Sequence, residues 1–291
     1  MNSTQRAVKY CAMAFAIILA VGIISGMASV LFVVMNAVSG NTGTGKFNIG
    51  FGKSEKNVSM DYDRTFTGVN SLNIENGIGS LNIKVGDEFR VEAYNVSKKF
   101  EVKVDDNGRL NVSDHKGSFG ILWFNLGGLT NPTANITVYV PSDFVAKEVL
   151  VDTGAGTTNL EGIHTDYLFV DGGAGSIHAS DIRAKRIKWD GGVGTTSITN
   201  VYSEDSNFNC GVGKLSVSGK LLGETNLDCG IGEVILDMKG EEADYGYKVD
   251  TGIGKISLNN EKISGKNNTN ARNLIKVDGG VGSVKITIRS S

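Results

Sequence analysis

The chain has 291 residues, enough for one large domain or two ordinary ones. Its 39 glycines against 2 prolines favour many tight turns and argue against a proline-rich disordered linker protein. The formal net charge is −2. Only two of the 29 basic residues, Arg6 and Lys9, and none of the 31 acidic residues precede position 41, so the rest of the chain is mildly acidic. This balance gives no indication of a nucleic-acid partner.

An uncharged apolar segment runs from Tyr10 to Met35. As a helix, its 26 residues measure about 39 Å, which exceeds the roughly 30 Å of hydrocarbon in a bilayer. We predict a transmembrane helix over residues 10–36, a cytoplasmic N-terminus over residues 1–9 and a flexible spacer over residues 37–57. Because two basic residues precede the apolar segment, we expect a single-pass protein of the cell membrane whose remaining residues are extracellular.

The N-terminal segment supports two further hypotheses. Cleavage of a signal peptide at Ala37-Val38-Ser39 is the alternative to a retained anchor, although the apolar part of a signal peptide is usually shorter. Gly22 and Gly26 have the spacing at which two membrane helices approach closely, so a homodimer through this helix is a second hypothesis.

A short element recurs along the second half of the chain. It consists of an acid or amide, a small residue, Gly, an aliphatic residue and Gly. Copies begin at Asp152, Asp171, Asp190, Asn209, Asp228, Asp250 and Asp278, and an earlier copy begins at Glu75. From Asp152 to Asp228 the copies follow one another at a constant step, and the two later steps are longer. A fixed period of this length, about 19 residues, indicates a repeat architecture.

Each repeat shows the alternation of a strand with one buried face. The residue before the acid is apolar, as at Trp189 and Phe208, and so is the residue three after it, as at Val193. Both positions are predicted to face the core. After Gly-x-Gly the apolar positions become the sixth and eighth, as at Leu215 and Val217, so the strand turns a corner there.

A further bend is expected near Glu161-Gly162, Ser180-Asp181 and Thr199-Asn200. Three short strands and three bends in each repeat describe one rung of a parallel β-solenoid. We therefore predict an all-β fold, a parallel β-solenoid preceded by one transmembrane helix. Irregular N-terminal rungs and a cap are expected over residues 58–147, and regular solenoid repeats over residues 148–291.

Stacked rungs should bring residues one period apart to about 4.8 Å from one another. Asp166, Lys185 and Glu204 would then form one column of alternating charge. Arg186, Asp205 and Glu224 would form the next, so the basic run around them is interpreted as cross-rung pairing.

The two ends of the stack need protection from strand pairing with other molecules. At the C-terminal end we expect Lys285 and Arg289 to serve as edge charges. At the N-terminal end, Asp105-Asp106-Asn107-Gly108 is predicted to form a turn, and the apolar segment 117–129 forms either a cap or an exposed loop patch.

The glycine-rich element is not a phosphate loop, because strand sequences follow it in place of a helix. The carboxylates at its first position are expected to point outward in a ladder. They are Asp152, Asp171, Asp190, Asp228, Asp250 and Asp278. Either each carboxylate accepts hydrogen bonds from its own corner, or the ladder is a calcium site.

Cys210 and Cys229 occupy the same position in consecutive rungs. They are expected to form a buried thiol pair, with a disulfide as the alternative. The three histidines, His115, His164 and His178, have no evident nucleophile partner, so we expect no catalytic residues, no enzyme activity and no cofactor.

One segment resembles a known group of proteins. The stretch ANITVYVPSDFVAKEVLVDTGAGTTNLEGI, followed by rungs of the type VDGGAGSIHASDI, is similar to the bacterial putative adhesin family of Gram-positive envelopes. The resemblance covers Ser71 to Ile288. It implies a β-solenoid that is often attached to a membrane segment, with no agreed ligand.

These observations favour a non-enzymatic cell-surface solenoid, an adhesin or scaffold that binds an envelope polymer or protein. The partners expected are the membrane and an extracellular protein or polysaccharide. The alternative is the ectodomain of a regulatory protein that senses envelope stress.

Overall fold

The structure, a computed structural model, describes residues 60–114, 134–209, 211–250, 252–263 and 267–290. All of them belong to one compact unit, Ser54–Ser291. The predicted transmembrane helix, the spacer and the segment 117–129 lie outside the described residues. Among the described residues, no helix is long and apolar enough to cross a membrane.

The described residues form one hydrogen-bonded sheet system and a single short 3-10 helix, η2. In chain order the elements are β1 (Met60–Phe66), β2 (Ser71–Gly86), β3 (Phe89–Val96), β4 (Glu101–Val104), β5 (Arg109–Asp114), β6 (Ala134–Pro141), β7 (Ala146–Glu161), β8 (His164–Asp190), β9 (Val193–Asn209), β10 (Val212–Leu221), β11 (Glu224–Lys239), η2 (Glu242–Asp244), β12 (Tyr245–Asp250), β13 (Ile253–Leu258), β14 (Glu261–Lys262), β15 (Asn267–Asn268) and β16 (Asn273–Arg289). The prediction of an all-β solenoid is confirmed.

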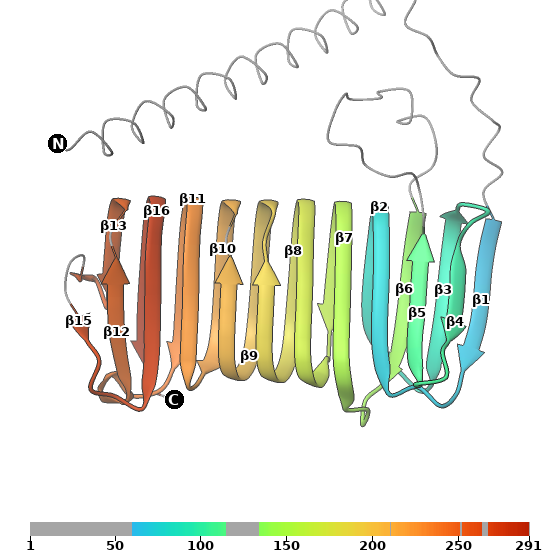
Figure 1. Ribbon diagram of the computed structural model, residues 1–291, viewed down its shortest axis with the longest axis horizontal. Helices are drawn as coiled ribbons and strands as arrows, with labels where there is room; N and C mark the ends of the chain where they lie inside the picture. Colours follow the sequence, from blue (N-terminus) through green and yellow to red (C-terminus); the bar gives the residue numbers. More distant parts are fainter. Residues whose placement is uncertain (1–59, 115–133, 210, 251, 264–266, 291) are drawn as a thin grey trace, which may run out of the picture. The chain divides into compact units, whose positions relative to one another are not determined.

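The central strands β7 to β11 pair in parallel with the register that the repeat predicts (Figure 1). Val151 lies opposite Val170, Ala174 opposite Val193, and Val212 opposite Ile231, each pair one repeat apart in the sequence. Because this spacing holds in successive pairs, side chains at equivalent positions form columns along the stack.

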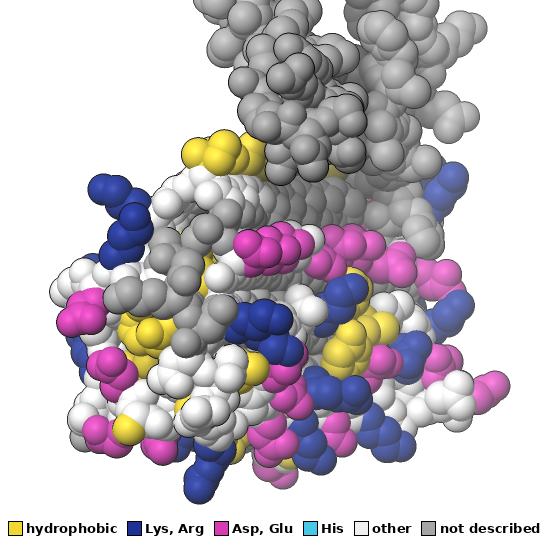
Figure 2. All heavy atoms as spheres, turned by 60° about the vertical axis from the view of Figure 1, so that its left-hand side comes forward, with side chains coloured by type: hydrophobic (Ala, Val, Ile, Leu, Met, Phe, Trp, Pro, Cys, Tyr) yellow, Lys and Arg dark blue, Asp and Glu magenta, His cyan; other side chains and the backbone are white. Residues whose placement is uncertain are grey.

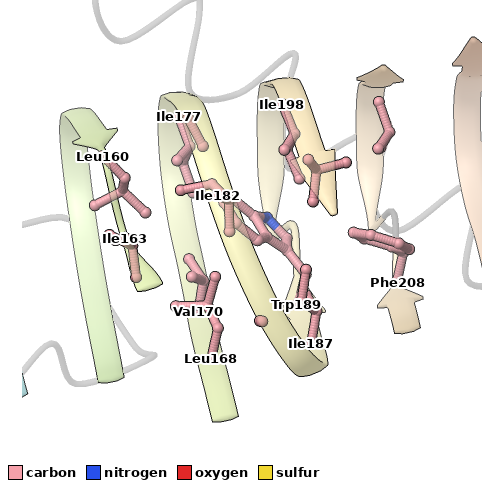
Figure 3. Packing of buried hydrophobic residues seen from close by; sticks show 14 of the residues in the cluster. Leu160, Ile163, Leu168, Val170, Ile177, Ile182, Ile187, Trp189, Ile198 and Phe208 are labelled. Carbon is pink, nitrogen blue, oxygen red and sulfur yellow. The ribbon is translucent and has the colours of Figure 1, made fainter. Parts of the chain in front are cut away.

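The core runs inside the rungs (Figure 3). Trp189 and Phe208 occupy equivalent positions on adjacent rungs and are 1% and 0% exposed. The predicted inward residues Leu215 and Val217 are also buried. Burial of these columns supplies the main stabilisation of the solenoid, at about 1.5–3 kcal/mol for each large aliphatic side chain.

The predicted bends are confirmed by the backbone. The second glycine of the Gly-x-Gly element has a positive φ, +143° at Gly194, for example. The other bend has left-handed residues at Gly162, Asp181 and Asn200, with φ of 68°, 55° and 53°. Glycine, Asn and Asp tolerate this conformation best, which explains their recurrence at these positions.

The order of the rungs at the C-terminal end differs from their order in the sequence. β16, the last strand, pairs with β11 on one side and with β12 and β13 on the other. Lys285 and Arg289 therefore lie within the stack, and their predicted role as edge charges is wrong. The terminal rung of β12 and β13 is instead bordered by the two-residue strands β14 and β15, which pair with Ser257–Leu258 and Tyr247–Lys248 and cover part of its edge.

A similar rearrangement occurs at the N-terminal end. β2 pairs in parallel with β7, and on its other side with β5 and β6. The antiparallel strands β3, β1 and β4 then extend the sheets beyond β5 and β6. Glu75 stands opposite Asp152, so the early copy of the repeat forms a rung in register with the others.

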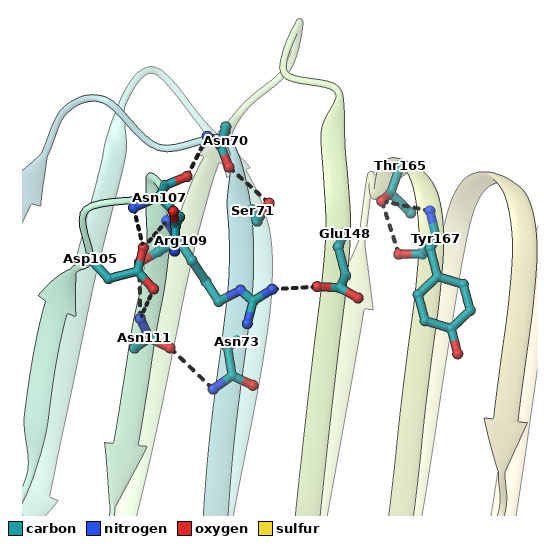
Figure 4. A network of polar contacts seen from close by, with 10 residues as sticks. All are labelled: Asn70, Ser71, Asn73, Asp105, Asn107, Arg109, Asn111, Glu148, Thr165 and Tyr167. Carbon is teal, nitrogen blue, oxygen red and sulfur yellow. Dashed lines mark hydrogen bonds and ion pairs between the residues drawn. The ribbon is translucent and has the colours of Figure 1, made fainter.

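A polar network holds the N-terminal strands to the rungs (Figure 4). The Asp105 carboxylate accepts hydrogen bonds from the backbone N–H groups of Asn107 and Arg109, at 2.9 and 3.0 Å, in the predicted turn. Arg109 forms an ion pair of 2.6 Å with Glu148 at the start of β7. These contacts tie β5 to β7 across the intervening β2.

Candidate functional site

At the Gly-x-Gly corner, side chains at equivalent positions of successive rungs lie next to one another on the surface. The first position of the element forms what we call the acid column. In spatial order it contains Glu75, Asp152, Asp171, Asp190, Asn209, Asp228, Asp278 and Asp250. The aspartates are exposed except Asp190, which is half-buried, so the predicted outward ladder is confirmed as geometry. The column carries a line of negative charge along the stack.

The aliphatic position of the element does not face the core, and this expectation is wrong. Its residues form a second outward column, which we call the corner ladder. In spatial order it contains Ile78, Ala155, Ala174, Val193, Val212, Ile231, Val281 and Ile253. Val193 and Ile231 are both 57% exposed, and Ile253 is 76% exposed. The alternation breaks because the chain turns at the glycines before it reaches this position.

Close stacking of the backbone explains the glycines around the corner ladder. A Cβ atom added to Gly194 would lie 1.9 Å from the carbonyl oxygen of Gly175 on the next rung, and Gly213 meets Gly194 in the same way. The glycines leave a low band of backbone beside the projecting aliphatic side chains. In Figure 2 a row of acidic side chains runs along the stack, with hydrophobic side chains above it.

Charge repulsion and loss of hydration act within the acid column. The pKa of Asp152 is raised above its ordinary value, first because the carboxylate is partly desolvated and then because Asp171 and Glu75 are close. Among the described residues, one corner hydrogen bond is present, and its acceptor is an amide oxygen and not a carboxylate: Gly211 N–H donates to Asn209 Oδ1 at 3.2 Å. Asp190 instead lies 3.6 Å from the Lys188 ammonium group. The column therefore keeps most of its acceptors on the surface.

The calcium hypothesis for the acid column stays a prediction. Within the part of the chain that the structure describes, no three His, Cys, Asp or Glu side chains converge as a metal site. The carboxylates follow one another in a line at the rung spacing, whereas calcium takes about 6–8 oxygen ligands around one point. A line of this kind can attract a row of positive charges.

The neighbouring face confirms one predicted charge column and alters the other. Lys185 pairs with Asp166 at 2.7 Å, and this contact raises the pKa of the ammonium group. Arg186 stands opposite Asp205 in register, but its guanidinium lies over the Tyr167 ring of the adjacent rung, 5.5 Å from the centroid. Lys188 lies over Phe169 in the same manner, at 4.9 Å. Cation–π contacts between rungs therefore occupy these basic side chains.

Over the described residues, the corner offers a surface and not a pocket for a small molecule. Two hollows at the Gly-x-Gly corners have volumes of about 20 and 10 Å³. Pockets for drug-sized ligands measure about 300–1,000 Å³. The arrangement suits a partner that spreads over several rungs.

The remaining predicted site residues lie elsewhere or outside the described part. Cys210 is outside the described residues, so neither the thiol pair nor the disulfide is tested. His164 is half-buried at the start of β8, His178 is exposed in the same strand, and His115 is outside the described residues. Strand alternation predicted that the corner ladder faces the core, whereas the structure exposes it. The glycine on each side of the aliphatic residue indicates this exposure, because a turn at these glycines interrupts strand alternation.

The chain was compared with curated proteins and with solved structures. No curated protein matches the chain. Among solved structures, a protein described as a putative cell adhesion protein from Clostridium sporogenes is 16% identical, covering 80% of this chain and 100% of its own, with a TM-score of 0.37. A putative adhesin from Bacteroides fragilis is 15% identical, covering 78% of this chain and 96% of its own, with a TM-score of 0.43.

The family model described as Toastrack DUF4097 matches residues 69–291. This range agrees with the resemblance to the adhesin family that the repeats indicated over Ser71 to Ile288, and that resemblance is confirmed. The chain belongs to the Toastrack DUF4097 family.

Proposed function

We propose that the protein is a non-enzymatic cell-surface solenoid, an adhesin or scaffold whose outward columns bind an envelope protein or polymer. The observation that carries this proposal is the corner of the rungs, where the acid column and the corner ladder repeat side by side over eight rungs. A regular surface of this length suits a partner that contacts several rungs at once. The names of the solved structures, adhesins and a cell adhesion protein, agree with such a role.

The electrostatics of the corner narrow the choice of partner. An anionic polymer would meet the carboxylates of the acid column and be repelled, at about 1 kcal/mol for each pair of like charges roughly 4 Å apart in water. A protein or polymer with positive charges would be attracted. Exposed aliphatic side chains on the corner ladder add an apolar contribution that a purely charged partner does not use.

The membrane anchor and the extracellular position of the solenoid belong to the same proposal. Both rest on the apolar segment from Tyr10 to Met35 and on the basic residues before it. Protease treatment of intact cells tests them, because an extracellular solenoid is digested while a cytoplasmic one is protected.

A deletion in cells tests the binding function. One strain expresses the full chain, and a second expresses a chain without residues 58–291 that retains the apolar segment. The proposal expects that the deletion abolishes attachment of cells to their partners and leaves responses to envelope damage unchanged. Normal attachment with a lost stress response would contradict it and favour the regulatory ectodomain.

A further inference from the structure

The bulky part of the corner ladder lies over the C-terminal rungs. Val193, Val212, Ile231, Val281 and Ile253 follow one another on adjacent rungs, with exposed fractions between 45% and 76%. Four steps at the strand spacing make a line about 19 Å long. Ordered, adjacent exposure of five large aliphatic side chains is unlike the scattered single residues of an ordinary surface.

The two flanks of this line differ in charge. On one flank runs the acid column, with Asp190, Asp228, Asp278 and Asp250 on four of these rungs and the neutral Asn209 on the Val212 rung. On the other flank Lys214 pairs with Glu233 at 3.0 Å, and the exposed Lys255 adds one positive charge in the same column. The aliphatic line therefore has a strongly negative border on one side only.

We propose that this corner binds a cationic amphipathic α-helix of another polypeptide. Its apolar stripe would lie along the corner ladder, and Lys or Arg side chains beside that stripe would face the acid column. The proposal rests on the proposed function of the solenoid as a binding module, and it names the class of partner.

Spacing favours a helix over an extended strand. Side chains on one face of a helix recur at about 5.4 Å per turn, close to the rung spacing of about 4.8 Å. Side chains on one face of a strand recur at about 6.6 Å, which falls out of step within two rungs. A helix of about 13 residues covers the bulky part of the ladder.

Charge complementarity favours a cationic helix over an anionic lipid surface and over a second copy of the chain. An anionic lipid surface would present negative charge to the acid column. A second copy of the chain would bring the same acidic corner. A cationic helix removes the repulsion within the column while it covers the aliphatic side chains, so it satisfies both features of the surface.

Binding of a designed peptide tests the proposal. The probe is a labelled amphipathic peptide of about 14 residues made of Leu and Lys, long enough to span the ladder as a helix. It is added to the full chain in phosphatidylcholine nanodiscs, with empty nanodiscs as the blank. Fluorescence anisotropy should show saturable binding that weakens as salt is raised. A peptide of the same pattern with Glu in place of Lys should bind at least about tenfold more weakly.

Matched variants locate the site. Ile231→Ser with Ile253→Ser should weaken binding about tenfold, whereas Val145→Ser changes a side chain that is 64% exposed away from the ladder and should not. Asp228→Asn with Asp278→Asn should weaken binding about fivefold and flatten its salt dependence. Glu161→Gln with Glu204→Gln makes the same change in net charge off the column and serves as the control.

Four outcomes would overturn the inference. Equal binding of the Glu peptide, or equal losses in the ladder and control variants, would show that the contact is not specific to this corner. Binding of the chain to phosphatidylglycerol vesicles that the ladder variants abolish would assign the face to lipid. A dimer of the full chain that becomes monomeric in the ladder variants would assign it to a second copy. Unchanged cell attachment in the strain that lacks residues 58–291, together with peptide binding by the full chain, would show that the proposed function fails while this inference holds.

Discussion

Trp189 and Val193 lie close together in the sequence of one rung and differ completely in their surroundings. Trp189 is 1% exposed and lies in register with Phe208 in the core, whereas Val193 is 57% exposed on the corner ladder. Both are apolar, and both recur in every repeat as apolar or aromatic residues. The difference shows that the same repeat builds two apolar columns. One is buried and stabilises the fold, and the other is exposed on the surface.

The largest expected effect separates these columns directly. Trp189→Ala should lower the free energy of unfolding by about 3–5 kcal/mol, because a fully buried aromatic side chain leaves a cavity. Val193→Ala should change it by less than about 0.5 kcal/mol, because the side chain is mostly in water already. Urea denaturation of both variants checks the comparison, and equal losses would contradict the assignment of the two columns.

The second prediction concerns the turn that separates the columns. Gly194→Ala should destabilise the protein by about 2–4 kcal/mol, because φ is +143° and the new Cβ would overlap the Gly175 carbonyl oxygen. Gly68→Ala is the matched control: φ is +72°, no atom lies within 4 Å of the added Cβ, and only the backbone strain of about 1–2 kcal/mol applies. Thermal melts of the two variants should differ clearly. Similar melting temperatures would mean that rung contact does not select this glycine.

The smallest effect tests the acid column beside the ladder. Asp152 has a raised pKa, so the folded protein binds more protons than the unfolded chain between the ordinary pKa of 3.8 and the raised one. The free energy of unfolding therefore falls as the pH rises through this window, and the loss is complete above it. Asp152→Asn should recover less than about 1 kcal/mol at neutral pH, since the carboxylate is exposed.

The same experiment has a control on the same rung. Glu161→Gln makes an equal change in net charge at an exposed position away from the acid column. Denaturation at pH 3 and pH 7 should show a gain for Asp152→Asn at pH 7 only, and little change for Glu161→Gln. A gain at both pH values would show that carboxylate repulsion is not the cause.

Much of the solenoid follows from the repeat. The constant period, the inward columns that contain Leu215 and Trp189, and the bends at Asp181 and Asn200 are all visible in the sequence, because local conformation and burial impose the same residue types on every rung. The outward acid column follows for the same reason. Of the candidate site, one of the two columns was therefore predictable.

The side on which Val193 stands was not predictable from alternation alone. Strand alternation assigns it to the core, but the backbone conformation at Gly192 and Gly194, with φ of 60° and 143°, rotates the chain between them. A pattern of apolar residues shows which positions repeat, but it does not give the angle through which the backbone turns at a corner. The three-dimensional path of the glycine corner decides this orientation.

The sequence by itself determined the class of fold, the rung length and the inward columns, because these depend on local spacing that every repeat restates. Only the tertiary structure decided which rungs are neighbours at the two ends. Asp228 stands opposite Asp278, although the copy at Asp250 comes between them in the sequence, and β2 stands between β5 and β7. Equivalent rungs present the same hydrogen-bonding groups at their edges, so local sequence does not determine which rungs become neighbours. The packing of the complete chain determines it.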